Sequence, residues 1–233
     1  MDEMRASRAQ VVQSALDLFA QPRYLEIGVA KGATFHETRA FRKTAVDPYF
    51  KFDVGDARSS HPEARYFNLP SDAFFAQCPI GEKFDVIYID GLHTFEQTLR
   101  DLMNALSHLA DRSVIIIDDI FPNSLAAAQR ARADFVAVRE HLGLENKAWM
   151  GDVYKLVLFI DSFLQSWTFR CVSDNHGQLV MWQAPRETVD ERFVSDIGLA
   201  GYERAIIERA SFRFAPLEAI IGELREALAA RPV

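Results

Sequence analysis

Short apolar runs alternate with amphipathic stretches along most of the chain. A period close to 3.6 residues predicts helices, and short runs rich in β-branched and aromatic residues predict strands. The clearest strands are 84–89 (FDVIYI) and 113–117 (SVIII). The complete set of predicted strands is 24–27, 44–46, 65–67, 84–89 and 113–117. The predicted helices are 5–19, 34–41, 95–109, 125–142 and 153–164, the last with Asp152 as its N-cap.

This alternation of strands and helices is typical of an α/β fold with a parallel sheet. Two further runs, 167–173 and 178–183, flank the turn DNHG and predict a β-hairpin after the five βα units. From residue 186 onward the chain becomes polar and then helical, with 216–230 as the clearest helix. No repeat or low-complexity linker interrupts the sequence, so we expect one domain. Residues 1–185 would hold the sheet and residues 186–233 would form a helical C-terminal extension.

Three roles are open for this extension: packing on the sheet, covering a site as a lid, or contacting a second copy in a homodimer.

The composition excludes several classes of function. Of the 233 residues, 49% are hydrophobic and 25% are charged, as in globular proteins that do not enter a membrane. The net charge of −7 disfavours a large nucleic-acid interface, which normally appears as a basic patch. No apolar run approaches the length of a membrane span.

Only two cysteines occur, Cys78 and Cys171, and their separation fits neither a metal site nor a disulfide framework. The N-terminal stretch is amphipathic and does not have the apolar core of a signal peptide. We therefore expect a cytoplasmic protein.

Acidic residues lie at the carboxyl ends of four of the five predicted parallel strands: Glu26, Asp47, Asp90 and Asp118. Open α/β sheets bind their ligands at this edge. The edge is therefore where we expect the site.

A glycine turn follows the first strand, with the spacing Glu26-x-Gly28-x-x-x-Gly32. It differs from the phosphate-binding GxxxxGK[ST] loop and from the dinucleotide-binding GxGxxG loop, because position 30 is alanine. Asp47 follows the second strand, where a carboxylate can bind both hydroxyls of a ribose. Ser71, next to Asp72, is placed to meet an adenine ring, although the pair could equally start a helix. Taken alone, the glycine turn could also be an ordinary strand-to-helix connection beside a buried acid.

A second group of candidates contains Asp90, His93, Asp118 and Asp119. Neighbouring strand ends are about 5 Å apart, so the three carboxylates can converge. A Mg²⁺ ion would relieve their repulsion, hold a substrate hydroxyl and lower its pKa. His93 can accept the hydroxyl proton as general base. The alternatives are that Asp118 and Asp119 cap the following helix and that His93 is a surface residue.

The glycine turn resembles the first motif of class I S-adenosylmethionine (SAM) dependent methyltransferases. The runs 84–96, 99–102 and 114–120 are similar to a branch that contains macrocin O-methyltransferase-like and cephalosporin-hydroxylase-related enzymes. The segment 149–155 (WMGDVYK) also resembles the W-x-G-D-V-[WY]-K signature of that branch. The similarity extends over residues 24–182, but the hairpin turn is less glycine-rich than expected and the extension has no counterpart.

The resemblance implies a Rossmann-like sheet that is mostly parallel, with its last strand antiparallel. It also implies roles for individual residues: SAM held by Glu26, Gly28, Gly32, Asp47 and Asp90, Mg²⁺ held by Asp90, Asp118 and Asp119, and His93 as the base. Ser71 stays the candidate for the adenine.

Three hypotheses follow. The first is SAM-dependent, metal-assisted O-methylation of a small hydroxylated molecule such as a sugar or natural product. The second is a nicotinamide-dependent dehydrogenase on a related sheet. The third is a SAM-binding protein without turnover.

Overall fold

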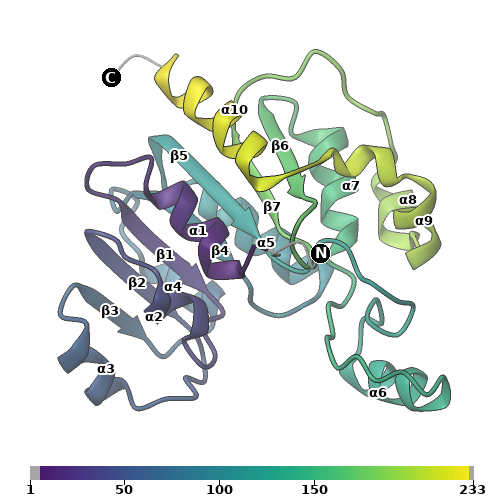
Figure 1. Cartoon of the computed structure of the whole chain (residues 1–233), viewed down its shortest axis with the longest axis horizontal. Coiled ribbons are helices and arrows are strands. Elements are labelled where there is room, and N and C mark those ends of the chain that lie inside the picture. Colours follow the sequence, from purple (N-terminus) through teal and green to yellow (C-terminus); the bar gives the residue numbers. More distant parts are fainter. Residues whose placement is uncertain (1–5, 231–233) are drawn as a thin grey trace, which may run out of the picture.

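The computed structural model describes residues 6–230 and shows one mixed sheet with helices on both faces (Figure 1). The strand order within these residues is β3-β2-β1-β4-β5-β7-β6-β8. Strand β7 is antiparallel to both of its neighbours, and the other pairs are parallel. The predicted mostly parallel sheet with an antiparallel late strand is confirmed. The strands are β1 (Arg23–Ile27), β2 (Arg42–Val46), β3 (Ala64–Phe67), β4 (Phe84–Ile89), β5 (Leu109–Ile117), β6 (Trp167–Val172), β7 (Leu179–Gln183) and β8 (Phe214–Ala215).

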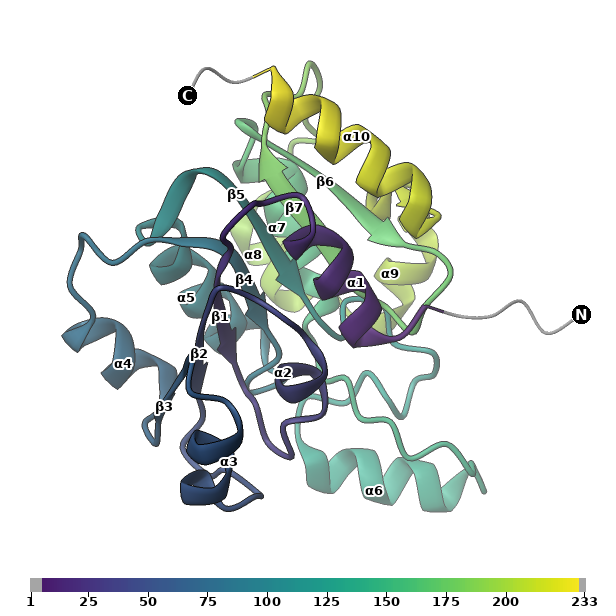
Figure 2. The ribbon, with the colours of Figure 1, turned by 60° about the vertical axis from the view of Figure 1, so that its left-hand side comes forward.

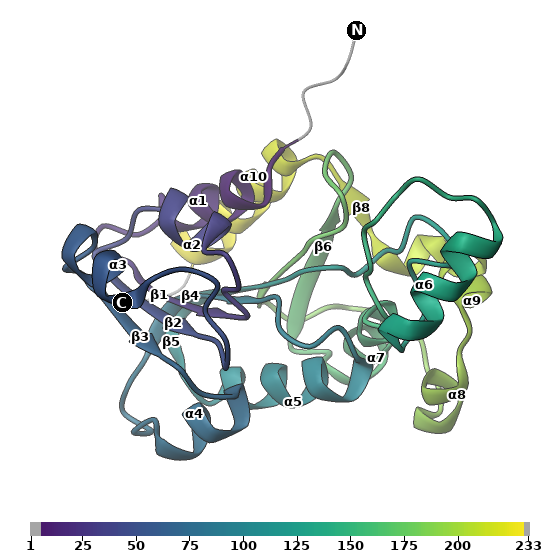
Figure 3. The ribbon, with the colours of Figure 1, turned by 90° about the horizontal axis from the view of Figure 1, so that it is seen from below.

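Two helical layers cover the sheet. Helices α1, α2, α3 and α10 lie on one face and α4, α5 and α7 on the other (Figure 3). Helix α6 stands apart from both layers, beyond the ends of the strands (Figures 1 and 2). The helices are α1 (Arg8–Leu16), α2 (Ala33–Glu37), α3 (Val54–Ser60), α4 (Ser71–Gln77), α5 (Phe95–Leu106), α6 (Arg132–His141), α7 (Tyr154–Phe163), α8 (Val194–Leu199), α9 (Tyr202–Ile207), the 3-10 helix η1 (Arg209–Phe212) and α10 (Leu217–Ala229).

The apolar strand residues alternate between two cores. Leu25 and Ile115 belong to the core under α5 and α7, whereas Tyr24 and Ile116 belong to the core under α1 and α10. This follows from the period of two along a strand, which sends successive side chains to opposite faces. The run SVIII is buried on both faces because β5 lies in the middle of the sheet.

The predicted helix at 125–142 is wrong in its first part, because α6 begins only at Arg132. Residues 126–128 are alanines, which favour helices, but here they are buried against the core. The carbonyl of Ala127 accepts hydrogen bonds from the amides of Met150 and Gly151, both at 3.0 Å. Tertiary contacts therefore override the local helix preference.

Other predicted boundaries also differ. The helix at 95–109 ends at Leu106, since β5 already begins at Leu109. The helix at 34–41 ends at Glu37, where buried Lys43 donates to the carbonyls of Phe35 and, at 2.7 Å, of Thr38. Helices α3 and α4 were not among the predicted elements.

Helices α1 and α7 also begin at residues other than the predicted ones. Helix α1 begins at Arg8, after an N-cap at Ser7, and the predicted start at Arg5 lies outside the described residues. Asp152 is not the N-cap of α7, because Val153 holds that position. The Asp152 Oδ1 atom instead accepts the amide of Phe95 at 2.8 Å, at the start of α5.

The C-terminal extension joins the sheet. Strand β8 pairs with β6, and α10 packs on α1 and β6, so of the three roles the described residues favour packing on the sheet. Three arginines of the extension, Arg186, Arg192 and Arg213, converge on the fully buried Asp161 of α7 at 2.9 to 3.1 Å. Among the helices described here, none has the length and apolar character needed to cross a membrane.

Candidate active site

A cavity of about 780 Å³ opens at the carboxyl ends of the parallel strands. Pockets of this size commonly hold cofactors and small ligands. The predicted site residues that line it are Gly28, Asp47, Ser71, Asp90 and His93. Its wall continues through Trp149 and through residues of α6, including Phe135. The structure thus brings the two groups of sequence candidates to one cavity.

The glycine turn after β1 requires a glycine at position 28. Gly28 has a φ of +88°, and a Cβ built there would lie 1.9 Å from the carbonyl oxygen of Asp90. The β1 and β4 loops can approach one another only because this side chain is absent. Asp47 fixes the rest of the turn, because its carboxylate accepts the amides of Ala30 at 2.8 Å and Tyr49 at 2.6 Å.

Two predicted cofactor residues, Glu26 and Gly32, lie outside the cavity lining. Glu26 is buried beside Tyr24, whose hydroxyl donates to Glu26 Oε2 at 2.6 Å. Burial raises the pKa of Glu26 to about 8, although the hydrogen bond from Tyr24 opposes this shift. Gly32 faces the ring of His36. A role of either residue in SAM binding stays a prediction.

Ser71 is the first residue of α4 and lines the cavity. The pair of Ser71 and Asp72 thus does start a helix, as the alternative has it, although the N-cap of α4 is Pro70 and no side chain caps this helix. Gln97 of α5 donates to Ser71 Oγ at 3.2 Å and holds it at the cavity edge.

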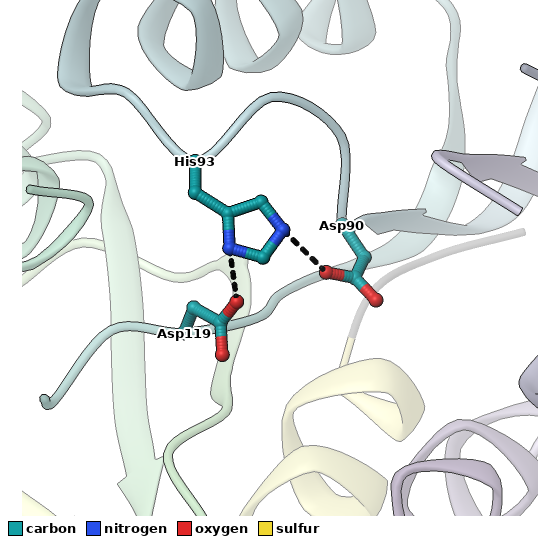
Figure 4. A group of neighbouring side chains, drawn as sticks. All are labelled: Asp90, His93 and Asp119. Carbon is teal, nitrogen blue, oxygen red and sulfur yellow. Dashed lines mark ion pairs between the residues drawn. The ribbon is translucent and has the colours of Figure 1, made fainter. Parts of the chain in front are cut away.

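His93 and Asp119 form the best-defined pair in the site (Figure 4). Nδ1 of His93 is 2.7 Å from Asp119 Oδ2 and 3.0 Å from the carbonyl oxygen of Trp149. Both neighbours are acceptors, so Nδ1 carries the proton. Nε2 is then the basic atom of the neutral ring, and it is directed toward Asp90, with Oδ1 3.8 Å away.

The backbone at Asp119 and the segment of Trp149 and Gly151 hold this pair in place. Asp119 has a φ of +59°, a left-handed conformation that places its buried side chain under His93. The indole ring of Trp149 stacks on the imidazole at 5.0 Å with an interplanar angle of 5°. Gly151 lets the segment of Trp149 approach, since a Cβ there would lie 1.7 Å from the carbonyl oxygen of His93. His93 is therefore a fixed cavity residue, and the surface alternative is wrong.

Two residues that the sequence analysis did not single out complete the cluster. Arg8, at the start of α1, places Nε 2.5 Å from Asp118 Oδ2 and Nη2 3.5 Å from Asp119 Oδ1. His176, in the β6–β7 turn, places Nε2 3.3 Å from Asp118 Oδ1. No local spacing signals these contacts, because the residues come from opposite ends of the sequence. Asp118 and Asp119 also do not cap a helix, since the N-cap of α6 is Ala131.

The charges in this cluster shift one another's pKa values. Burial, with Asp118 and Asp119 nearby, raises the pKa of Asp90. Burial alone would lower the pKa of His93, but the hydrogen bond and charge of Asp119 outweigh it and raise the pKa. Burial would likewise raise the pKa of Asp119, but His176 and His93 hold it well below its usual range. Asp119 is therefore the ionised partner of His93.

The three carboxylates of the predicted Mg²⁺ triad do not form one convergent set of ligand atoms as the side chains stand. Among the described residues, possible ligand atoms converge within 4.8 Å in two groups, Asp90–His93–Asp119 and Asp118–Asp119–His176. Neither group consists of the three carboxylates. The Arg8 guanidinium already lies against Asp118 at 2.5 Å, where a cation would have to bind.

The chain is similar to known proteins in part of its sequence and in its fold. Residues 25–120 match the model of a methyltransferase domain family. No curated protein sequence matches the chain. The narrower branch suggested by the sequence motifs stays a prediction.

Solved structures share the fold. A candidate O-methyltransferase from Klebsiella pneumoniae is 15% identical, with a TM-score of 0.50 over 78% of this chain and 83% of that one. A cofactor-bound protein from MTB is 17% identical, with a TM-score of 0.50 over 79% and 84%. An S-adenosylhomocysteine-bound methyltransferase from Podospora anserina is 15% identical, with a TM-score of 0.50 over 78% and 80%. Residues 25–120 thus match a methyltransferase domain, and the chain shares the fold of these solved structures.

Proposed function

We propose that this protein transfers the methyl group of SAM to a hydroxyl group of a small molecule, with His93 as the general base. One observation carries the proposal. The His93 ring is held through Nδ1 by Asp119 and by the carbonyl of Trp149, which leaves Nε2 free to accept a proton at the cavity. A base within reach of a hydroxyl is what O-methylation needs beyond positioning.

The strand-end side of the cavity suits the cofactor. Gly28, Asp47 and Ser71 line it, and the Asp47 oxygens keep lone pairs for ribose hydroxyls besides the two amides that they accept. When bound, SAM supplies an electrophilic methyl group on a sulfonium. Trp149 and Phe135 add aromatic surface to the same cavity, which suits a small organic acceptor.

His93 performs the proton transfer in this proposal. Nε2 takes the hydroxyl proton as the acceptor oxygen gains the methyl group, and the resulting imidazolium is stabilised by ionised Asp119 at 2.7 Å. The proton later leaves His93 to water. This Asp–His arrangement also fixes the tautomer of the ring before the acceptor binds.

Metal assistance was part of the prediction from the sequence, and the proposal includes no step through a metal ion. Arg8 lies against Asp118, and His93 and His176 lie against Asp119, so positive or proton-donating groups already face the carboxylates. The positioning of the acceptor therefore falls to the cavity walls and His93.

Different observations argue against the two alternative functions from the sequence. The methyltransferase match over residues 25–120 supports methyl transfer over a nicotinamide-dependent dehydrogenase. A SAM-binding protein without turnover would not need a fixed base, so the His93–Asp119 pair favours an enzyme.

Calorimetry and an activity assay test the proposal together. We expect SAM, but not NAD, to give a saturable heat of binding. Incubation with a panel of hydroxylated sugars and phenols should release S-adenosylhomocysteine. His93→Gln should retain SAM binding and lose transfer by roughly 10²- to 10⁴-fold, the usual contribution of a general base. Absence of SAM binding, or transfer that survives His93→Gln, would contradict the proposal.

A further inference from the structure

We propose that Arg8 is a built-in cation that occupies the place of a divalent metal ion against Asp118 and Asp119. It is a positioning residue, because its guanidinium lies against both carboxylates and Asp119 lies against His93. The consequence is that this site binds no Mg²⁺ while Arg8 is present. Arg8 would exclude a divalent cation from this place whichever methyl acceptor the protein uses.

The first support is the placement of the guanidinium. Nε of Arg8 is 2.5 Å from Asp118 Oδ2, and Nη2 is 3.5 Å from Asp119 Oδ1, so one side chain spans both carboxylates. The Asp118 and Asp119 side chains are only 1% and 4% exposed, whereas Arg8 is 41% exposed. The cation therefore closes the solvent side of a buried acidic pair, as a bound metal ion would.

The second support is the need for a positive charge at this point. Asp90 lies beside the pair, so three carboxylates share one corner of the sheet. Within the described residues, neither Asp118 oxygen makes a hydrogen bond of normal geometry. Attraction between charges, rather than a set of directed hydrogen bonds, therefore neutralises Asp118. A buried carboxylate without such a partner is costly.

The third support is the way the fold holds Arg8. Helix α1 starts at this residue, after a capping box in which Ser7 and Gln10 bond reciprocally. The amide of Ala6 donates to the carbonyl of Asp174 at 2.9 Å, which ties the start of α1 to the β6–β7 turn. His176 of the same turn lies 2.9 Å from Arg8 Nε and faces Asp118 as well. The start of α1 and the β6–β7 turn thus hold Arg8 beside the carboxylates.

A Mn²⁺ titration of the SAM-free protein tests the proposal, with the free ion measured by electron paramagnetic resonance. We expect no saturable Mn²⁺ binding by the wild-type protein. Arg8→Gln removes the charge and the Nη atoms but keeps a nitrogen at the position of Nε, and it should gain one Mn²⁺ site per chain. Mn²⁺ should also raise the unfolding temperature of this variant and leave that of the wild type unchanged, because a ligand stabilises only the state that binds it.

Matched variants separate charge from other effects. Arg23→Gln breaks a comparable pair with Asp85 at 2.9 Å, which does not belong to the acidic corner, and should gain no Mn²⁺ site. Adding Asp118→Asn to Arg8→Gln should remove the acquired site. Arg8→Lys keeps the charge and should stay free of Mn²⁺, which preserves the test if Arg8→Gln folds poorly.

Three results would overturn the proposal: stoichiometric Mn²⁺ binding by the wild type that Asp118→Asn abolishes, a folded Arg8→Gln that gains no site, or an Arg8→Lys that binds Mn²⁺ as Arg8→Gln does. Neither the Mn²⁺ titration nor the unfolding temperature requires SAM or a methyl acceptor. A failure here is therefore distinguishable from a failure of the proposed methyl transfer.

Discussion

At the residue scale, the reactivity of the site depends on which nitrogen of His93 carries the proton. Asp119 Oδ2 and the carbonyl oxygen of Trp149 lie 2.7 and 3.0 Å from Nδ1, and neither can donate a proton, so the neutral ring presents Nε2 as its base. The sequence motif DGxH was enough to predict His93 as a base. It could not predict Arg8 and His176, because contacts between the start of the chain and a distant hairpin have no local pattern.

The pH dependence of the reaction should report the pKa of His93. The base works only when neutral, so activity falls as the pH drops through this pKa. Although burial lowers the pKa, Asp119 raises it above the ordinary 6.5. Asp119→Asn should therefore move the acid limb of the kcat/KM profile to lower pH and also reduce the rate. Asparagine tolerates the left-handed backbone at this position. An acid limb that does not move would show that Asp119 does not set the basicity of His93.

Glu26 gives a second pH prediction, on stability. Its pKa rises on folding from 4.5 to about 8 because of burial, so the folded state binds the proton more tightly. The stability from this group is present below pH 4.5 and is lost as the pH rises toward 8. Glu26→Gln mimics the protonated form and should remove this loss. Urea unfolding of the wild type and of Glu26→Gln at pH values below 4.5 and near 8 measures this change in the free energy of unfolding. An equal pH dependence of the two proteins would contradict the prediction.

At the scale of elements, strands were predicted better than helices. The β-branched runs 84–89 and 113–117 fall within β4 and β5, because strands at the centre of a sheet are buried on both faces and show it in their composition. The alanines at 126–128 were misassigned, because the carbonyl of Ala127 bonds to a distant segment. Helices α3 and α4 are too short for a period of 3.6 residues to appear clearly.

The loop of Gly28 connects the two halves of the site. Gly28→Ala would place a methyl group 1.9 Å from the carbonyl oxygen of Asp90, so the β1 and β4 loops must separate. We expect a loss of SAM affinity of at least tenfold, or about 1.4 kcal/mol, measured by calorimetry. Gly81→Ala is the control, since no described atom lies within 4 Å of its added Cβ. Equal SAM affinity of Gly28→Ala and the wild type would contradict this role of the turn.

At the scale of the whole molecule, the chain combines a sheet shared with solved methyltransferase structures and an extension that adds a strand to it. The succession of strands β1 to β7 along the chain follows from the βα alternation and the hairpin, which the sequence shows, but their order in the sheet was not predicted. The addition of β8 to the edge could not be predicted, because its two residues carry no strand pattern. The position of α10 on β6 depends on long-range packing in the same way.

Asp161 should hold this extension to the rest of the chain. It is fully buried and pairs with three arginines of the extension, so its loss leaves buried positive charges without a partner. Asp161→Asn should lower the free energy of unfolding by about 3–5 kcal/mol, as for other broken buried pairs. Asp85→Asn, which breaks the more exposed pair with Arg23, should cost about 1 kcal/mol or less. Similar losses in the two variants, measured by urea unfolding, would contradict this role.

The most direct test of the central claim is the transfer of a labelled methyl group from SAM to hydroxylated acceptors in the presence of EDTA. We predict that the wild-type protein forms a labelled methyl ether under these conditions and that His93→Gln does not. Transfer that needs added Mg²⁺, or that proceeds equally in His93→Gln, would contradict the account.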